Sequence, residues 1–299
     1  MTDINTLRQR FIELSHPLEP EETGTEPVLK TLEGIKAVIF DFYGTLFASG
    51  VGDIGIDDGK SDAKLLLAAL EGAGITVSDK KAGSRGFVIY NKVVTEKIVE
   101  LKASGIPYPE PDIRKVWAHV LNQMYAEKLI TDNTTPDQHD RMAVEFEVRM
   151  NPIWPMPDLS ETLKELKWKG LHLGIISNSQ FYTPIAFEAL SGQSLHELGF
   201  NPNLLQWSFE ESRKKPGLVF YEHFLDKATK ELPDLQPENY LYVGNDMLKD
   251  IYPADHLGMR TALFAGDARS LKWRREDGRT KNLQPDIIIT ELRQLLECV

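Results

Sequence analysis

The chain has 299 residues, of which 41% are apolar and 26% are charged, a composition typical of a globular protein with one large domain or two smaller ones. Its formal net charge of −11 argues against a nucleic-acid-binding surface, which needs a basic face, and against binding to anionic membranes. The single cysteine, Cys298, excludes a disulfide within the chain, and no run approaches the ~18 apolar residues of a membrane helix, so we expect a cytoplasmic protein.

The first part of the chain, residues 1–33, is expected to be an N-terminal extension. Apolar side chains at helical spacing predict a short helix over 4–14. Residues 15–27 are rich in Glu, Pro and Thr, which is typical of a linker. The main domain then begins with "AVIFDF" at 37–42, an apolar run without alternation, which predicts a strand that is covered on both faces.

Residues 50–149 interrupt this pattern and predict an inserted helical domain. Segments with helical spacing are 61–74, 88–105, 112–129 and 136–150. The insertion starts with "GVGDIG" at 50–55, which matches the G-x-G-x-x-G pattern of dinucleotide-binding proteins. That pattern needs its first glycine at the end of a strand, whereas "DFYGTLFAS" intervenes in this chain. We therefore interpret 48–60 as a hinge and keep dinucleotide binding as an alternative.

Residues 150–299 alternate between predicted strands and predicted helices. Strands are expected at 172–179, 239–246, 260–266 and 286–290. Helices are expected at 158–168, 217–231, 248–257 and 290–297, and Gly170 and Gly258 occupy helix C-cap positions. Such alternation is typical of a doubly wound parallel sheet. The sequence thus predicts an α/β fold with a Rossmann-like core, formed by 34–49 and 150–299, and an inserted helical domain.

Polar side chains stand at the points where the predicted strands end. Asp41 ends the first strand, Ser177 and Asn178 end the second, and Asn245 and Asp246 end the next. In open parallel sheets, ligands bind at the carboxyl ends of the strands, where these residues would meet. We therefore expect one site that combines carboxylates, a hydroxyl and amides.

Two further residues extend this set. Asp250 follows Asp246 by one helical turn, and Lys215 precedes Pro216, which is expected to open the helix over 217–231. A carboxylate can attack phosphorus or carbon and form a covalent intermediate. Lysine and other donors stabilise phosphate oxygens, and Mg²⁺ prefers oxygen ligands. The residue types therefore indicate nucleophilic chemistry on an anionic substrate with Mg²⁺.

These segments resemble four motifs of the haloacid dehalogenase-like (HAD) hydrolase superfamily. "DFYGTL" at 41–46 is similar to its first motif, Asp-x-Asp-Gly-Thr-Leu/Val. Ser177-Asn178 resembles its Ser/Thr-Asn motif, Lys215-Pro216 its Lys-Pro motif, and "GNDMLKD" at 244–250 its acidic motif. All four occur in the family's order, and the helical insertion stands where the family places a cap over the site.

The resemblance implies a role for each matched residue. Asp41 would be the nucleophile and a metal ligand, and the backbone carbonyl of Tyr43 would be a second ligand. Ser177, Asn178 and Lys215 would hold the phosphate. The anchors of the Mg²⁺ ion, direct or through water, would be Asn245, Asp246 and Asp250.

Position 43 departs from the family's phosphatases, which usually carry an acid there to protonate the leaving alcohol. Tyr43 is a poor substitute for this acid, because the ordinary pKa of tyrosine is about 10. The haloacid dehalogenases of the family also carry a tyrosine at this position, and their halide leaving group needs no proton. The acidic motif instead favours the phosphatases, because the haloacid dehalogenases of the family use no metal. Without a metal, Asp246 and Asp250 would raise the pKa of the nucleophile and suppress its attack.

The sequence thus predicts a Mg²⁺-dependent phosphatase that acts on a small phosphate monoester through an aspartyl phosphate on Asp41. The alternative is a metal-independent 2-haloacid dehalogenase-type hydrolase. A catalytically degenerate family member that binds a ligand is a further alternative. Nucleic-acid and membrane partners are not expected, the basic stretch at 270–281 is interpreted as a surface loop, and oligomeric state is left open.

Overall fold

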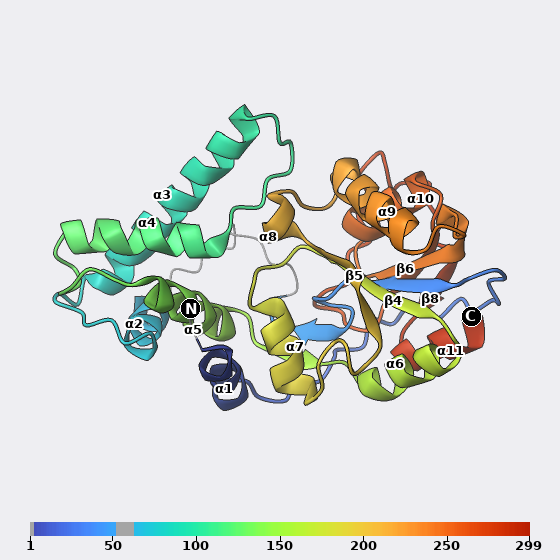
Figure 1. Ribbon diagram of the computed structural model, residues 1–299, viewed down its shortest axis with the longest axis horizontal. Helices are drawn as coiled ribbons and strands as arrows, with labels where there is room; N and C mark the ends of the chain where they lie inside the picture. The colour runs from blue at the N-terminus through green and yellow to red at the C-terminus, as the bar shows by residue number, and fades with distance from the viewer. Residues whose placement is uncertain (1–2, 52–62) are drawn as a thin grey trace.

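A six-stranded parallel sheet forms the centre of the molecule in the computed structural model, which describes residues 3–51 and 63–299 (Figure 1). Its order is β5-β4-β1-β6-β7-β8. The strands are β1 (Ala37–Phe40), β4 (His172–Ser177), β5 (Phe200–Trp207), β6 (Tyr240–Gly244), β7 (Arg260–Phe264) and β8 (Ile287–Ile289). From β1 the chain adds β4 and β5 on one side and then β6, β7 and β8 on the other, so the predicted doubly wound α/β fold is confirmed.

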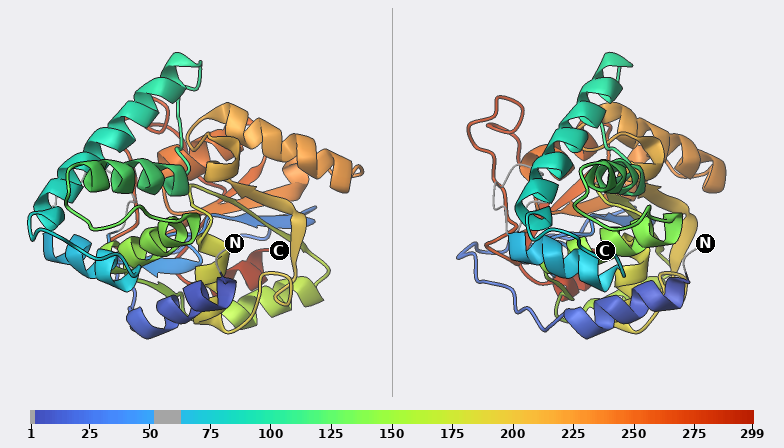
Figure 2. Two further views of the ribbon diagram at one scale, coloured as in Figure 1. Left: turned by 60° about the vertical axis from the view of Figure 1, so that its left-hand side comes forward. Right: turned by 90° about the vertical axis from the view of Figure 1, so that its left-hand side faces the viewer.

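Helices cover both faces of this sheet (Figures 1 and 2). Helices α6 (Leu159–Trp168) and α11 (Leu295–Cys298) lie on one face, and α9 (Leu218–Glu231) and α10 (Tyr252–His256) lie on the other. All four residues of β1 are fully buried between these layers, which explains its unbroken apolar run. The glycines after α6 and α10, Gly170 and Gly258, have φ of +81° and +83°, as expected for left-handed helix ends.

Several elements lie outside the predicted pattern. They are β5, the antiparallel pair β2 (Phe47–Ser49) and β3 (Ile153–Pro155), α7 (Thr183–Ser191) and α8 (Ser208–Glu211). Strand β5 was missed because Asn201, Pro202 and Asn203 interrupt its apolar residues. It lies at the edge of the sheet, where a strand tolerates proline.

Two predicted helices of the core have a different form in the structure. The segment predicted as one helix over 248–257 begins as a π-helical turn, η2 (Met247–Ile251), and continues as α10. The segment 290–297 forms the 3₁₀ turn η3 (Leu292–Gln294) before α11. A further 3₁₀ turn, η1 (Pro237–Asn239), precedes β6.

The insertion between β2 and β3 consists of helices that pack on one another beyond the end of the sheet (Figure 1). They are α2 (Ala63–Gly72), α3 (Ala82–Ala103), α4 (Ile113–Ala126) and α5 (Pro136–Met150). Their aromatic residues pack together, with the ring centroid of Trp117 4.9 Å from that of Tyr90 and 5.0 Å from that of Phe146, and they continue the hydrophobic core of the sheet domain. The limits 50–149 and a cap function stay predictions, and most of the expected hinge and of "GVGDIG" falls outside the described residues.

The N-terminal extension joins the insertion to the core. Helix α1 (Ile4–Leu14) buries Leu7 and Phe11 against α7 and α5. Arg10 pairs with Glu145 of α5, and Arg8 lies 2.8 Å from Glu188 of α7. The extension therefore holds a helix of the insertion against a helix of the core.

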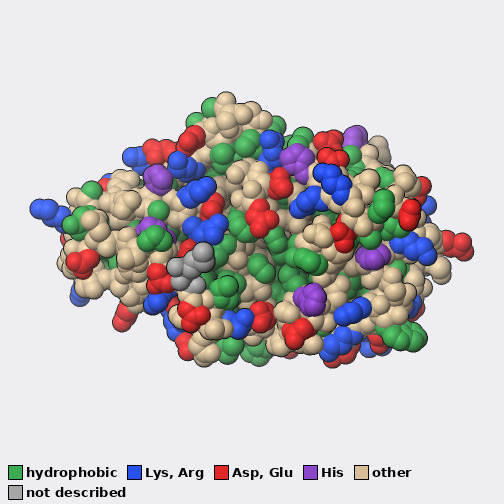
Figure 3. Space-filling view, viewed as in Figure 1, with side chains coloured by type: hydrophobic (Ala, Val, Ile, Leu, Met, Phe, Trp, Pro, Cys, Tyr) green, Lys and Arg blue, Asp and Glu red, His purple; other side chains and the backbone are tan. Residues whose placement is uncertain are grey.

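The outer surface shows no dominance of one charge sign on the face in Figure 3, where Lys and Arg side chains alternate with Asp and Glu. Within residues 3–51 and 63–299, no helix combines the length and the apolar character needed to cross a membrane.

A buried polar cluster lies where the chain passes between core and insertion. Glu147 of α5 accepts hydrogen bonds from Tyr182 Oη at 2.8 Å and from Asn151 Nδ2 at 3.1 Å, and Ser49 Oγ donates to Asn151 Oδ1 at 2.7 Å. Burial raises the pKa of Glu147, and the two hydrogen bonds oppose this shift. The folded protein therefore holds a proton at Glu147 more tightly than the unfolded chain does.

We expect Glu147→Gln to change how stability depends on pH. An acid whose folded-state pKa is raised loses stabilisation as pH rises from its unfolded pKa of about 4.5 through the folded value. The neutral variant lacks this loss, so its free energy of unfolding relative to wild type should increase between pH 5 and pH 8. Urea denaturation at both pH values measures the difference, with Glu33→Gln at an exposed position as the control. If the free energy of unfolding differs between variant and wild type by the same amount at pH 5 and at pH 8, the raised pKa of Glu147 is contradicted.

Candidate active site

Asp41 lies directly after β1 at the carboxyl edge of the sheet. Its N–H donates to Val243 O at 2.9 Å, and its Oδ1 accepts from Phe42 N at 2.7 Å. The chain then turns at Gly44, which has φ of +78°. A Cβ there would lie 2.5 Å from Ser270 Cβ, so the turn requires glycine in both conformation and space. This turn fixes Asp41 at the switch point of the sheet.

Lys215 is the central cation of the site and is 2% exposed. Its Nζ lies 2.8 Å from Asp41 Oδ1, 2.5 Å from Asp250 Oδ1 and 3.2 Å from Tyr242 Oη. Burial lowers the pKa of Lys215, but the charges of Asp250 and Asp41 outweigh it, so the pKa is raised and the lysine stays charged.

The backbone of Lys215 is fixed by Asn178, whose Oδ1 accepts from Lys215 N at 2.8 Å. The prediction that Pro216 opens the following helix is wrong. The Lys215–Pro216 peptide is cis, and α9 starts at Leu218 with Gly217 as its N-cap. Pro216 therefore belongs to the loop that carries Lys215 and not to the first turn of the helix.

Asp250 is fully buried and uses both carboxylate oxygens within the protein. Its Oδ1 accepts hydrogen bonds from Lys215 Nζ and, at 3.2 Å, from Tyr242 Oη. Its Oδ2 accepts a hydrogen bond from Asp246 N at 2.9 Å. Burial raises the pKa of Asp250, against the opposing effect of Lys215. The close fit depends on Gly244, because a Cβ there would lie 2.5 Å from Asp250 Cβ.

The other two residues of the acidic motif are also engaged. Asp246 Oδ1 caps η2 by accepting from Leu248 N at 2.8 Å, and its Oδ2 lies 2.7 Å from Arg274 Nη2. Asn245 Oδ1 accepts from Thr45 Oγ1 at 3.0 Å, and its Nδ2 donates to Ser270 O at 2.7 Å. Asn245 therefore ties the first turn of the site to the loop after β7.

These residues surround a small cleft of about 40 Å³. It is lined by Asp41, Tyr43, Asn178, Lys215, Asn245, Asp246, Lys249, Asp250, Ser270 and Lys272. Seven of the eight candidate residues from the sequence are thus brought together. Ser177, the eighth, is fully buried at the end of β4, with its Oγ 3.5 Å from Asn178 O, so its role in holding phosphate stays a prediction.

The interpretation of 270–281 as a surface loop is wrong for its first half. Ser270 is fully buried, Lys272 lines the cleft, and Arg274 pairs with Asp246. The sequence did contain a signal for this contact. The segment follows a predicted strand whose carboxyl end lies at the same sheet edge, and its basic residues complement the acidic motif.

Tyr43 places its side chain and its backbone in different surroundings. Its hydroxyl lies 2.9 Å from Thr183 Oγ1 in a buried setting. Burial, with the charges of Glu147 and Asp41, holds the pKa of Tyr43 well above its ordinary value, whereas Thr183 opposes the shift. Its backbone carbonyl accepts no hydrogen bond from the described residues.

The donor set suits a magnesium ion at the first turn of the site. Among the described residues, Asp41 Oδ2 and the Tyr43 carbonyl have no partner, and Asp246 Oδ2 is contacted by Arg274 alone. Mg²⁺ commonly takes one or two carboxylates and completes its shell with water and substrate phosphate. Asp250 and Asn245 are committed elsewhere and would act through hydrogen bonds. Accordingly, the described residues hold no preformed cluster of three or more His, Cys, Asp or Glu ligands.

Comparisons with known proteins agree with this geometry. Residues 35–258 match the family described as haloacid dehalogenase-like hydrolase. A curated relative, glyceraldehyde 3-phosphate phosphatase from Methanocaldococcus jannaschii, is 26% identical over 267 residues, which cover 89% of this chain and 97% of the relative. A solved structure, 2-haloacid dehalogenase from Pseudomonas syringae pv. Tomato DC3000, has a TM-score of 0.54 and 18% identity over 88% of this chain and 97% of that one. The last similarity shows a shared fold.

Proposed function

The chain belongs to the haloacid dehalogenase-like hydrolases and is a hydrolase, and from this premise we propose that it is a Mg²⁺-dependent phosphatase of small phosphate monoesters. The observation that carries the proposal is the uncommitted oxygen of Asp41 in a cleft that also contains Lys215 and Asp246. The name of the archaeal relative also supports phosphatase chemistry. A small phosphorylated substrate and a cytoplasmic location belong to the same proposal.

In the proposed reaction, Asp41 Oδ2 attacks phosphorus while the ester oxygen leaves on the opposite side. Lys215 Nζ and the side-chain amide of Asn178 offset the charge that develops on the phosphate oxygens. Asp250 holds Lys215 in place through its 2.5 Å contact. Water then attacks the phosphorus of the aspartyl phosphate, which frees inorganic phosphate and restores the Asp41 carboxylate.

The residues that would hold the metal ion are Asp41, through the carboxylate oxygen that does not attack phosphorus, the backbone carbonyl of Tyr43, and Asp246 once Arg274 releases it. When bound, the ion supplies positive charge beside two anions that would otherwise repel each other. Asn245 and Asp250 would orient these ligands through the hydrogen bonds that they already make.

Dehalogenation stays as the second candidate because Tyr43 provides no acid two residues after the nucleophile. We expect phosphate release that requires Mg²⁺ and stops with EDTA. Parallel assays of phosphate release from aryl and alkyl phosphates, and of halide release from 2-haloacids, each with Mg²⁺ and with EDTA, separate the two functions. Halide release that persists in EDTA would overturn the phosphatase proposal.

A further inference from the structure

A phosphatase that lacks an acid at position 43 needs another proton donor for its leaving alcohol. In an in-line displacement, the attacking and leaving oxygens lie on opposite sides of phosphorus. Asp41 stands at the edge of the sheet, so the leaving oxygen points away from the sheet. The helical insertion lies beyond this edge (Figure 1), and the donor is therefore expected on the insertion. Tyr43 is unsuited to the task, because its raised pKa makes it a weaker acid than a free phenol.

The loop between α3 and α4 brings one acid of the insertion to the core. Pro109 and Arg213 form an antiparallel bridge, Glu110 N donates to Ser212 O at 3.1 Å, and Lys214 N donates to Tyr108 O at 2.9 Å. The backbone of Glu110 is thus fixed to the segment that leads directly into Lys215.

The side chain of Glu110 is held just as closely. Its Oε1 accepts from Gln180 Nε2 at 3.0 Å, and its Oε2 lies 3.6 Å from Lys214 Nζ. Gln180 also donates to Pro111 O at 3.0 Å and accepts from Ile113 N at 2.9 Å. Gln180 stands two residues after the phosphate-site amide Asn178, so Glu110 contacts the neighbours of two residues that line the cleft.

We propose that Glu110 is the proton donor to the leaving alcohol, an inference that rests on the proposed phosphatase function. As the phosphorus–oxygen bond breaks, the proton of Glu110 passes to the ester oxygen and the alcohol leaves neutral. The resulting Glu110 carboxylate then takes a proton from the water that attacks the aspartyl phosphate. One proton is given and one is recovered, so Glu110 ends each cycle in its starting form.

The surroundings of Glu110 favour the protonated form that a donor needs. Burial raises the pKa of Glu110, and this effect outweighs the opposing charges of Lys214 and Lys249 and the hydrogen bond from Gln180. Burial raises the pKa of Tyr90 of α3, and the charges of Glu147 and Glu110 add to this shift.

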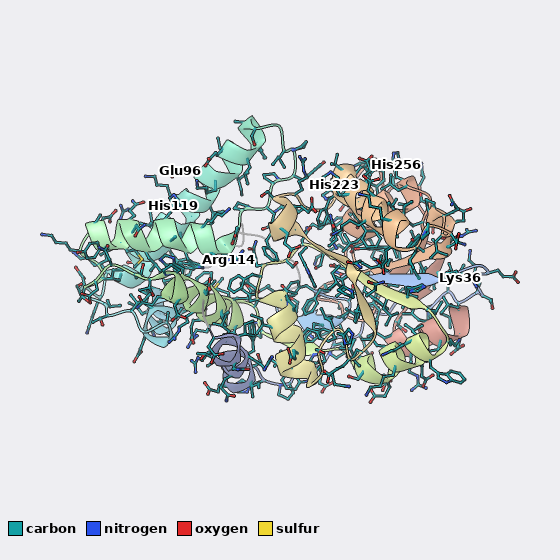
Figure 4. All side chains as sticks on the ribbon, viewed as in Figure 1. Lys36, Glu96, Arg114, His119, His223 and His256 are labelled. Carbon is teal, nitrogen blue, oxygen red and sulfur yellow. The ribbon has the colours of Figure 1, made fainter. Side chains whose placement is uncertain are left out.

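Like Glu110, the other acids of the insertion near the core have protein partners, but those partners lie outside the segments 178–180 and 213–215 that border the cleft. Glu145 pairs with Arg10 and Arg149, and Glu147 accepts from Tyr182 and Asn151. Asp112 caps α4 and binds Arg114, which lies where α4 approaches α8 (Figure 4). Among the described acids of the insertion, Glu110 combines burial with contacts to the loops on both sides of the cleft.

The test compares two substrates in wild type and in Glu110→Gln. Glycerol 3-phosphate has a poor alkoxide leaving group, whereas p-nitrophenyl phosphate has an acidic phenol that leaves without a proton. We expect Glu110→Gln to lower kcat for glycerol 3-phosphate by ~10²–10⁴-fold and kcat for p-nitrophenyl phosphate by less than about 10-fold. The alkaline limb of the kcat–pH profile for glycerol 3-phosphate should also disappear. Glu110→Asp, which keeps the acid, should retain more activity than the glutamine variant.

Asp112→Asn is the matched control, because it disturbs the same segment without removing the proposed donor. This control variant should change kcat by the same small factor for both substrates. If Glu110→Gln lowers kcat equally for both substrates, or for neither, Glu110 is not the proton donor, and the proposed phosphatase function is unaffected. If wild type releases no phosphate from either substrate, the proposed function itself fails and the inference fails with it. Thermal unfolding of each variant shows whether a loss reflects misfolding.

Discussion

Asp41→Asn is expected to reduce phosphate release by ~10⁴-fold or more while the fold survives. An amide oxygen is a far weaker nucleophile than a carboxylate, and no other described carboxylate that lines the cleft has an oxygen without a protein partner. Asp246 is held by Arg274, and Asp250 is fully buried beside Lys215. No neighbouring group can therefore take over the attack.

The fold should tolerate this change because asparagine keeps the shape of the side chain. The amide oxygen of the new side chain can still accept from Phe42 N, and Lys215 keeps its 2.5 Å contact with Asp250. Phosphate release under saturating substrate and a thermal melt measure the two effects, and Asp234→Asn, at an exposed position, is the control. A variant that keeps more than a few per cent of wild-type turnover would remove Asp41 from the role of nucleophile.

The sheet could be predicted because its strands are buried on both faces. The run at β1 and those at β4, β6, β7 and β8 are apolar without alternation, which is typical of parallel strands in an α/β fold whose helices cover both faces of the sheet. Strand β5 lacks this signal, since it lies at an edge and its apolar residues are interrupted by the exposed Pro202 and Asn203. The ends of helix α5 match the range 136–150 predicted from helical spacing, and in the structure Thr135 and Gln138 form a capping box at its start.

Most of the site residues that the sequence predicted are those that follow the ends of predicted strands. Asp41, Asn178 and Asp246 lie at or just beyond strand ends, and the topology alone brings them together. Tyr242 lies inside β6, and its hydroxyl reaches Lys215 across the sheet, a contact that no local pattern encodes. Glu110 belongs to a loop of the insertion whose docking depends on a bridge between Pro109 and Arg213, which are far apart in the sequence.

Lys215→Met is expected to destabilise the protein strongly as well as to inactivate it. The variant leaves the carboxylates of Asp41 and Asp250 in a buried site without their shared cation. Removal of one partner from a buried ion pair typically costs about 3–5 kcal/mol of the free energy of unfolding. Phosphate turnover should fall as well, because the variant lacks the cation that offsets the charge developing on the phosphate oxygens.

The size of this loss should depend on pH and on Asp250. With the lysine gone, burial raises the pKa of Asp250 without the opposing charge of Lys215, so the variant loses stability as pH rises through the folded-state pKa of Asp250. Urea denaturation at pH 5 and pH 8 should therefore show the larger loss of stability at pH 8.

The variant Asp250→Asn, combined with Lys215→Met, removes one of the two unpaired carboxylates. The double variant should be less destabilised than the sum of the two single variants. Lys214→Met, which alters the neighbouring and more exposed lysine, should change stability by less than about 1 kcal/mol. Strict additivity in this cycle would mean that Lys215 and Asp250 do not act as a pair, and the buried ion pair could then not be what holds the lysine beside Asp41.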